Sequence, residues 1–166
     1  MIIHKAQRVG VFVDIQNMYY SAKNLYRSKV NFNEILKQAV AGRALIRAIA
    51  YVIKTEVISE EKTFFDALEK IGFEVKAKPL QTFYGGAKKG DWDVGMVIDT
   101  IELAPKLDTV ILVSGDGDFI PLVEHLKRAM SCRVEVVAFI KSTSSKLIEA
   151  ADSFLDLCGD KKYLIK

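Results

Sequence analysis

Continuous apolar runs alternate with amphipathic stretches along the chain, and the two patterns predict different elements. Residues 8–14 and 108–114 are apolar through their interiors, as expected of strands that are buried on both faces of a sheet. Three further runs are predicted as strands: 44–53, 133–138 and 154–157. Residues 73–78 instead alternate with a period of two, which predicts an edge strand with one charged face.

Helices are predicted in the intervals between these strands. Their ranges are 18–25, 32–40, 59–71, about 93–104, 119–130 and 146–151. Either Asn31 or Asn33 is expected to cap the second helix, and Gly72 is expected to end the third. Strand and helix therefore alternate throughout, which is typical of a mainly parallel sheet with right-handed crossovers.

The predicted architecture is a three-layer α/β/α domain with a mainly parallel sheet of five or six strands. The strands at 8–14 and 108–114 are expected to be central and adjacent. The length of 166 residues fits one domain spanning 1–166, with a short basic tail at about 159–166. A hydrophobic content of 50% and a charged content of 27% are ordinary for a globular domain of this kind.

Composition adds only a little to this functional picture. A formal charge of +3 permits nucleic-acid binding without requiring it. Cys132 and Cys158 lack CxxC spacing, so they are expected to be reduced thiols. The sequence has neither a run of ~20 uninterrupted apolar residues nor a recognisable export signal. We therefore expect a cytoplasmic protein that has no membrane partner.

Acidic side chains follow both predicted central strands. Asp14 ends the first and Asp116 follows the other, and the carboxyl ends of parallel strands are where α/β sheets bind ligands. Asp118 is expected either to cap a helix that starts at Phe119 or to join this group. Asp93, at the start of another helix, is expected nearby. Because converging carboxylates repel one another, this group predicts a site for Mg²⁺ or Mn²⁺, which prefer oxygen ligands.

The helix at 93–104 contains two candidate acids. Its buried stripe is predicted from apolar residues at i, i+3, i+4 and i+7: Val94, Val97, Ile98 and Ile101. Asp93 borders this stripe, whereas Asp99 lies toward the more solvated side. Asp93 is therefore preferred as a ligand, and Asp99 as a supporting residue. Asn17 and Ser114 are predicted to support the site through an amide and a hydroxyl that orient a phosphate or a water molecule.

At these residues the chain resembles the NYN domain proteins, specifically the LabA-like branch of the PIN-like nuclease superfamily. The matching motifs are Val13-Asp-Ile-Gln-Asn17, Lys89-Gly-Asp-Trp-Asp-Val-Gly-Met-Val-Ile-Asp99, Val113-Ser-Gly-Asp-Gly-Asp-Phe-Ile-Pro-Leu122, and the segment 147–157 with Asp152 and Phe154. They span most of the chain in the order found in the family. Trp92 is a departure, because members commonly carry an aliphatic or small residue there.

The resemblance implies a PIN-like, Rossmann-like fold and metal-dependent hydrolysis of phosphodiester bonds, above all in RNA. It also implies an acidic cluster, both catalytic and metal-binding, composed of Asp14, Asp93, Asp116 and Asp118. Asn17 and Ser114 would support this cluster. The implied cofactor is Mg²⁺ or Mn²⁺.

Basic and aromatic residues before the helix at 93–104 are candidates for substrate binding. They are Lys76, Lys78, Tyr84, Lys88, Lys89 and Trp92. Such residues hold a phosphate backbone and stack an unpaired base. The alternative is that Lys76 and Lys78 protect an edge strand while Trp92 packs on the sheet. Tyr19 and Tyr20 are predicted to pack beneath their helix.

The leading functional hypothesis is a metal-dependent ribonuclease in which water attacks phosphorus in line, with no covalent enzyme intermediate. The alternative is a catalytically silent RNA-binding or protein-interaction module on the same fold. A phosphatase with an aspartyl nucleophile is disfavoured, because such enzymes typically need a second acid where this chain has Gln16. RNA is the expected partner, and a homodimer is a further expectation.

Overall fold

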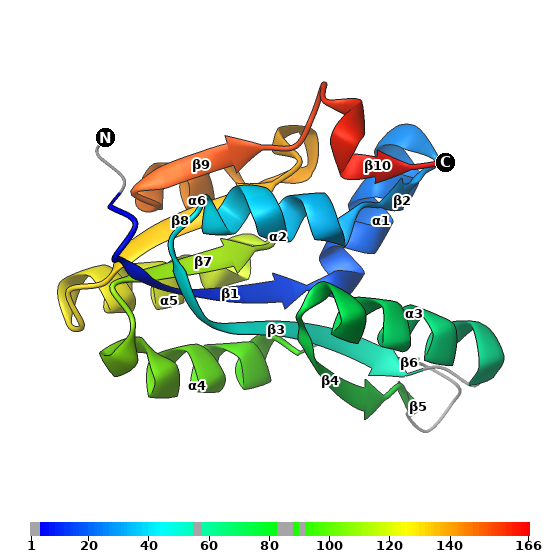
Figure 1. Cartoon of the computed structure of the whole chain (residues 1–166), viewed down its shortest axis with the longest axis horizontal. Helices are drawn as coiled ribbons and strands as arrows, with labels where there is room; N and C mark the ends of the chain where they lie inside the picture. Colours follow the sequence, from blue (N-terminus) through cyan, green and yellow to red (C-terminus); the bar gives the residue numbers. More distant parts are fainter. Residues whose placement is uncertain (1–3, 55–57, 83–87, 90–91) are drawn as a thin grey trace.

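The computed structural model describes residues 4–54, 58–82, 88–89 and 92–166. Its centre is a six-stranded sheet in the order β4-β3-β1-β7-β8-β9, and each neighbouring pair in it is parallel. The strands are β1 (Arg8–Asp14), β3 (Ala44–Lys54), β4 (Glu74–Pro79), β7 (Thr109–Val113), β8 (Arg133–Ala138) and β9 (Ser153–Asp156). The predicted parallel sheet, its central β1–β7 pair and its edge strand β4 are confirmed (Figure 1).

Helices cover both faces of this sheet. They are α1 (Ile15–Tyr26), α2 (Phe32–Val40), α3 (Ile58–Ile71), α4 (Asp93–Leu103), α5 (Ile120–Arg128) and α6 (Ser145–Ala150). Shorter elements are β2 (Lys29–Val30), β5 (Gln81–Thr82), β6 (Lys88–Lys89), β10 (Leu164–Ile165), and the 3₁₀ turns η1 (Ala104–Lys106), η2 (Gly117–Phe119), η3 (Ile140–Ser142) and η4 (Lys161–Tyr163). Helices α1 to α3 pack into one core and α4 to α6 into another, which is the predicted three-layer architecture (Figure 1). Among the described residues, no helix has the length and apolar character needed to cross a membrane.

The central strands fill the two cores alternately. In β1, Val11 and Val13 belong to the core under α1 to α3, whereas Phe12 belongs to the core on the other face. In β7, Ile111 and Leu112 divide in the same way. Because helices cover both faces of the sheet, side chains on either face are buried and apolar, which explains the continuous apolar runs. Each fully buried side chain of this size contributes about 1.5–3 kcal/mol to folding.

Asn31 at the start of α2 and Gly72 at the end of α3 lie at predicted helix boundaries. The Asn31 side chain accepts a hydrogen bond from the backbone N–H of Glu34 at 3.1 Å, so Asn31 and not Asn33 caps α2. Helix α3 is followed by Gly72, whose φ of +124° suits glycine. This placement confirms the predicted end of that helix.

The segment predicted as a basic tail is part of the packed structure. Tyr163 in η4 is 3% exposed and belongs to the core under α1 to α3. Strand β10 pairs antiparallel with β2, and the Asn31 side-chain amide donates to the carbonyl oxygen of Lys162 at 3.1 Å. These contacts tie the last described residues to the start of α2.

Helix α4 does not bury the stripe that was predicted for it. Val94 is 71% exposed and Ile98 is 50% exposed, whereas Met96 and Thr100 are buried. The other two members of the predicted stripe are only partly buried against the core. The buried face begins instead at Asp93 and continues through Met96 and Thr100, at i, i+3 and i+7. The Thr100 hydroxyl is satisfied in the core because it donates to the Met96 carbonyl oxygen at 2.6 Å.

Candidate metal centre

Two acidic residues reach the same edge of the sheet because β1 and β7 are paired in register. Val13 is opposite Val113, so Asp14 and Ser114 follow at the same level. Asp14 caps α1, since its Oδ1 accepts a hydrogen bond from the backbone N–H of Asn17 at 3.2 Å. This capping contact holds the Asp14 carboxylate at the carboxyl end of β1.

Asp116 caps the helical turn after β7, as Asp14 caps the helix after β1. It caps η2, and its Oδ1 accepts a hydrogen bond from the backbone N–H of Asp118 at 2.9 Å. The prediction that Asp118 caps this helix is therefore wrong. The helical turn begins at Gly117, two residues before the predicted start, and this moves the capping position to Asp116. The Asp118 side chain lies in the first turn and is exposed.

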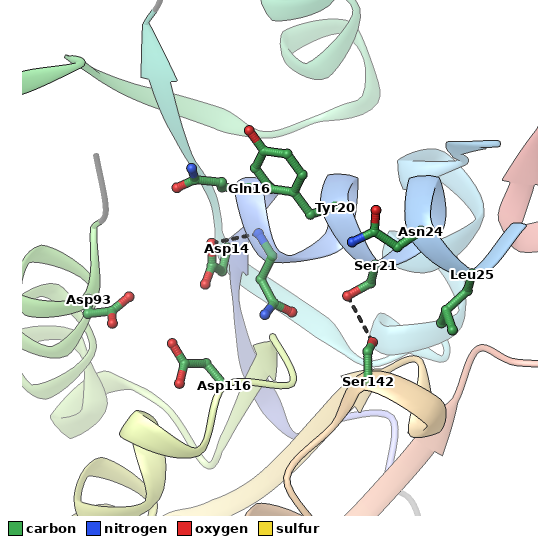
Figure 2. A pocket seen from close by; sticks show the side chains of 10 residues that line it. Asp14, Gln16, Tyr20, Ser21, Asn24, Leu25, Asp93, Asp116 and Ser142 are labelled. Carbon is green, nitrogen blue, oxygen red and sulfur yellow. Dashed lines mark hydrogen bonds between the residues drawn. The ribbon is translucent and has the colours of Figure 1, made fainter. Parts of the chain in front are cut away.

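Asp93, the first residue of α4, completes a group of three carboxylates. Asp14, Asp93 and Asp116 each offer an oxygen atom, and these atoms lie within 4.8 Å of one another. All three residues are partly buried, and their carboxylates point toward a common space (Figure 2). We call this group the acidic triad. Carboxylates this close repel one another in the charged state, which a cation between them would relieve. Among the described residues Asp118 and Asp99 are not part of this group.

Ser114 and Asn17 connect the two strands that carry the acids. The buried hydroxyl of Ser114 donates to Oδ2 of Asp14 at 3.2 Å and accepts from the backbone N–H of Asp116 at 3.2 Å. The Asn17 Oδ1 accepts from the backbone N–H of Gly115 at 2.9 Å. Ser114 is fully buried, and its hydroxyl positions the carboxylate of Asp14.

Gly115 is needed where the loop after β7 meets the segment before α6. A Cβ at this position would lie 2.7 Å from the Thr143 Oγ1 and 2.9 Å from the Ser142 carbonyl oxygen, so a larger residue would move the loop. The backbone N–H of Ser144 also donates to the Gly115 carbonyl oxygen at 3.0 Å. The close approach and the hydrogen bond together hold the backbone that presents Asp116.

Trp92 anchors the start of α4, immediately before Asp93. Its indole Nε1 donates to the Val52 carbonyl oxygen at 2.8 Å, and its ring lies edge-on to Tyr51 with centroids 5.4 Å apart. A Cβ on Gly95 would come within 2.5 Å of the Trp92 ring, so the helix approaches the indole closely only because residue 95 is glycine. Of the two alternatives for Trp92, these contacts support packing on the sheet.

Asp99 fastens α4 to the sheet further along the helix. Its Oδ2 accepts hydrogen bonds from the Tyr51 hydroxyl at 2.8 Å and from the Lys76 ammonium at 2.7 Å. Burial, followed by the hydrogen bond to Asp99, raises the pKa of the Tyr51 phenol, which therefore stays protonated as the donor. Asp99 thus acts on the site by holding the helix that carries Asp93.

Of the remaining predicted substrate-binding residues, Lys76 and Lys78 lie in β4, and Lys88 and Lys89 lie in β6, which pairs antiparallel with β5. The Lys78 ammonium lies 5.0 Å from the centre of the Trp92 ring, a cation–π contact. Lys76 is paired with Asp99. Lys88 and Lys89 form β6, and Tyr84 lies outside the described residues. A substrate role for Lys88 and Lys89 stays a prediction.

The acidic triad opens into a cavity of about 500 Å³ whose further lining was not predicted. The additional lining residues are Gln16, Tyr20, Ser21, Asn24, Leu25 and Ser142. The expectation that Tyr19 and Tyr20 pack beneath their helix is wrong, because they are 46% and 48% exposed. The sequence does carry a signal: α1 has polar residues at helical spacing beside its apolar stripe of Ile15, Met18 and Ala22.

Comparisons with known proteins agree with this fold and show the family of the chain. A family model described as the NYN domain matches residues 8–158. The chain is 27% identical over 175 residues to the "Low amplitude and bright protein LabA" of Synechococcus elongatus, over 98% of this chain and 90% of that protein. It also matches the crystal structure of VPA0982, a protein of unknown function from Vibrio parahaemolyticus, with a TM-score of 0.89 and 38% identity over 99% of this chain and 100% of that one. The chain therefore belongs to the NYN domain family of PIN-like nucleases and is LabA-like.

Proposed function

We propose that this protein is a Mg²⁺- or Mn²⁺-dependent nuclease that hydrolyses phosphodiester bonds in RNA. The observation that carries the proposal is the acidic triad, in which three separate elements of the chain bring oxygen atoms within 4.8 Å of one another. Capping accounts for Asp14 and Asp116 one at a time, but it does not explain why their carboxylates converge with that of Asp93, since three adjacent carboxylates repel one another. Membership of the NYN family supports the same activity.

The donor set of the acidic triad fits a hard divalent cation. Asp14, Asp93 and Asp116 offer only oxygen ligands, which suit Mg²⁺ or Mn²⁺ better than Zn²⁺, for which nitrogen and sulfur ligands predominate. A bound ion would supply Lewis acidity toward a phosphate oxygen and would activate water for in-line attack at phosphorus. Ser114 and Asn17 would keep the carboxylates in place through the hydrogen bonds described above.

A cleavage assay with controlled metal content tests this proposal. Wild-type protein is expected to cleave RNA with Mg²⁺ or Mn²⁺ and to lose this activity in excess EDTA, with single-stranded and structured RNA and DNA tested in parallel. Asp14→Asn is expected to be inactive but folded, because the asparagine oxygen can still accept the N–H of Asn17 at the α1 cap.

Two results would count against the nuclease proposal. Full activity of wild-type protein in excess EDTA would exclude the metal-dependent mechanism, and full activity of Asp14→Asn would exclude the proposed site. Salt-sensitive RNA binding without any metal-dependent product would instead favour the catalytically silent binding module.

A further inference from the structure

One face of helix α1 begins at Asn17, which supports the acidic triad, and continues through residues that the proposed nuclease chemistry does not use. Its members recur at i, i+3, i+4, i+7 and i+8, which places them on one side of the helix: Asn17, Tyr20, Ser21, Asn24 and Leu25. All of them line the cavity that contains the acidic triad. Figure 2 shows Tyr20, Ser21, Asn24 and Leu25 following one another along α1, away from Asp14. From residue 17 to residue 24 this face runs for roughly 10 Å at the helical rise of about 1.5 Å per residue.

Tyr20 is a large aromatic side chain held in the open part of this cavity. Tyr20 is 48% exposed, although aromatic residues of this size are usually buried to a greater extent. Tyr19 supports it edge-on, with ring centroids 5.3 Å apart and an interplanar angle of 77°. The Lys23 ammonium lies 5.7 Å from the centre of the Tyr19 ring. The exposed ring of Tyr20 therefore packs edge-on against one neighbouring ring, and its other surface is accessible for stacking.

The opposite side of the cavity is tied to α1 by a direct contact. The Ser142 hydroxyl in η3 donates to the hydroxyl of Ser21 at 2.9 Å, and Figure 2 shows this bond between the two walls. Apart from the acidic triad, the described residues that line the cavity are uncharged. Amides and an aromatic ring recognise bases, whereas a phosphate backbone is held by cations.

We propose that Tyr20 stacks on an unpaired base next to the phosphodiester bond at the acidic triad. In this arrangement the amides of Gln16 and Asn24, which flank Tyr20 on the cavity wall, donate to and accept from the edges of bases. Stacking on a side chain requires a base that is not paired in a duplex, so the site selects single-stranded nucleic acid. This inference rests on the proposed nuclease function and deepens it by naming a base-binding subsite.

Kinetics of Tyr20 variants on a single-stranded oligoribonucleotide test this subsite. Tyr20→Ala is expected to raise KM roughly 5- to 150-fold, the range set by losing one stacked base, while kcat stays within about 2-fold. Tyr20→Phe keeps the ring and is expected to stay within about 2-fold of wild type. Phe64→Ala serves as a matched control, because it removes an exposed aromatic ring from α3, outside the cavity.

A substrate with a missing base separates stacking from a general loss of structure. A series of oligoribonucleotides carries a single abasic position, placed at a different nucleotide near the cleaved bond in each. One member of the series should be a poor substrate for wild-type protein, because it lacks the base that stacks on Tyr20. Tyr20→Ala should lose nothing further on that substrate, since the interaction is already absent. Calorimetric titration with Mn²⁺ should give the same affinity for Tyr20→Ala and wild type.

The outcomes distinguish this inference from the nuclease proposal. If wild-type protein cleaves RNA and Tyr20→Ala has wild-type KM, the subsite is wrong and the nuclease proposal stands. If wild-type protein binds RNA in a Tyr20-dependent manner without cleaving it, the subsite stands and the proposed chemistry is wrong. Equal loss in Tyr20→Ala and Tyr20→Phe, or weakened Mn²⁺ binding in Tyr20→Ala, would also overturn the stacking role.

Discussion

Asp116→Asn is expected to lower metal-dependent RNA cleavage by more than about 100-fold without unfolding the protein. Residues that only support metal ligands cost about 10- to 100-fold when changed, so loss of a ligand itself should cost more. The fold should persist because the asparagine oxygen can still accept the N–H of Asp118 that now bonds to Asp116. Cleavage rates with Mn²⁺, together with thermal unfolding of both proteins, measure the two effects separately.

Asp118→Asn is the matched control, because it removes a carboxylate only two residues away. Asp118 is exposed and lies outside the acidic triad, although the sequence motif includes it among the candidate ligands. We expect the Asp118 variant to keep activity within about 10-fold of wild type, below the cost of losing a direct ligand. If Asp118→Asn were inactive and Asp116→Asn active, the assignment of the three ligands would be wrong.

Glu135→Gln is expected to destabilise the protein by about 3–5 kcal/mol, because it breaks a buried ion pair by removing one partner. The Arg43 side chain is 2% exposed, and its two terminal nitrogens donate to the two carboxylate oxygens of Glu135 at 2.8 and 3.0 Å. Arg133 donates to the same carboxylate at 2.9 Å. Without the negative charge, the guanidinium of Arg43 would remain buried without compensation.

The contribution of this pair should depend on pH in a defined direction. Burial raises the pKa of Glu135, but hydrogen bonds from Arg43 and Arg133 outweigh it and hold the pKa below its ordinary value of 4.5. A carboxyl with a lowered folded-state pKa stabilises the protein above its unfolded-state pKa and loses this effect as pH falls through the folded-state pKa. The difference between wild type and Glu135→Gln should therefore be full near pH 7 and shrink below about pH 4.

Urea unfolding of both proteins at pH 7 and at about pH 3 measures this difference. Glu74→Gln is the control, because it breaks the Arg47–Glu74 pair, whose side chains are 37% and 51% exposed. Exposed pairs contribute about 0–1 kcal/mol, so the control should remain close to wild type. Equal effects of the two substitutions at pH 7 would contradict the account of the buried pair.

The fold could be predicted from the sequence because its strands and helices carry local patterns. The apolar runs that became β1 and β7 are continuous because each strand is covered on both faces. Once these two runs are assigned as adjacent parallel strands, their carboxyl ends are expected at the same edge of the sheet, where such sheets bind ligands. This predicts that Asp14 and Asp116 lie close together. The structure contains both acids at that edge.

Features that depend on contacts between distant segments could not be predicted in this way. The rotation of α4 is set by Trp92 against Val52 and Tyr51, and by Asp99 against Lys76, and no hydrophobic period within the helix encodes these contacts. Asp93 lies in the acidic triad, although the buried stripe from which it was selected is wrong. The 3₁₀ turns η1 to η4 are likewise three residues long, which is too short for a periodic pattern to show in the sequence.

The cavity wall formed by α1 could not be predicted from the sequence either. The sequence favours packing for Tyr20, because most aromatic residues in a helix are buried. Only the tertiary structure shows that a cavity lies between this side of α1 and η3. A polar stripe at helical spacing next to an apolar one was visible in the sequence. Its meaning depended on which elements cover the helix.

Anomalous scattering from a crystal soaked in Mn²⁺ tests the central claim, that the acidic triad is a metal centre, most directly. We predict a peak at the manganese absorption edge between the carboxylates of Asp14, Asp93 and Asp116, and its loss in crystals of Asp93→Asn. A well-ordered triad with no peak at saturating Mn²⁺, or a peak that persists unchanged in Asp93→Asn, would contradict the claim.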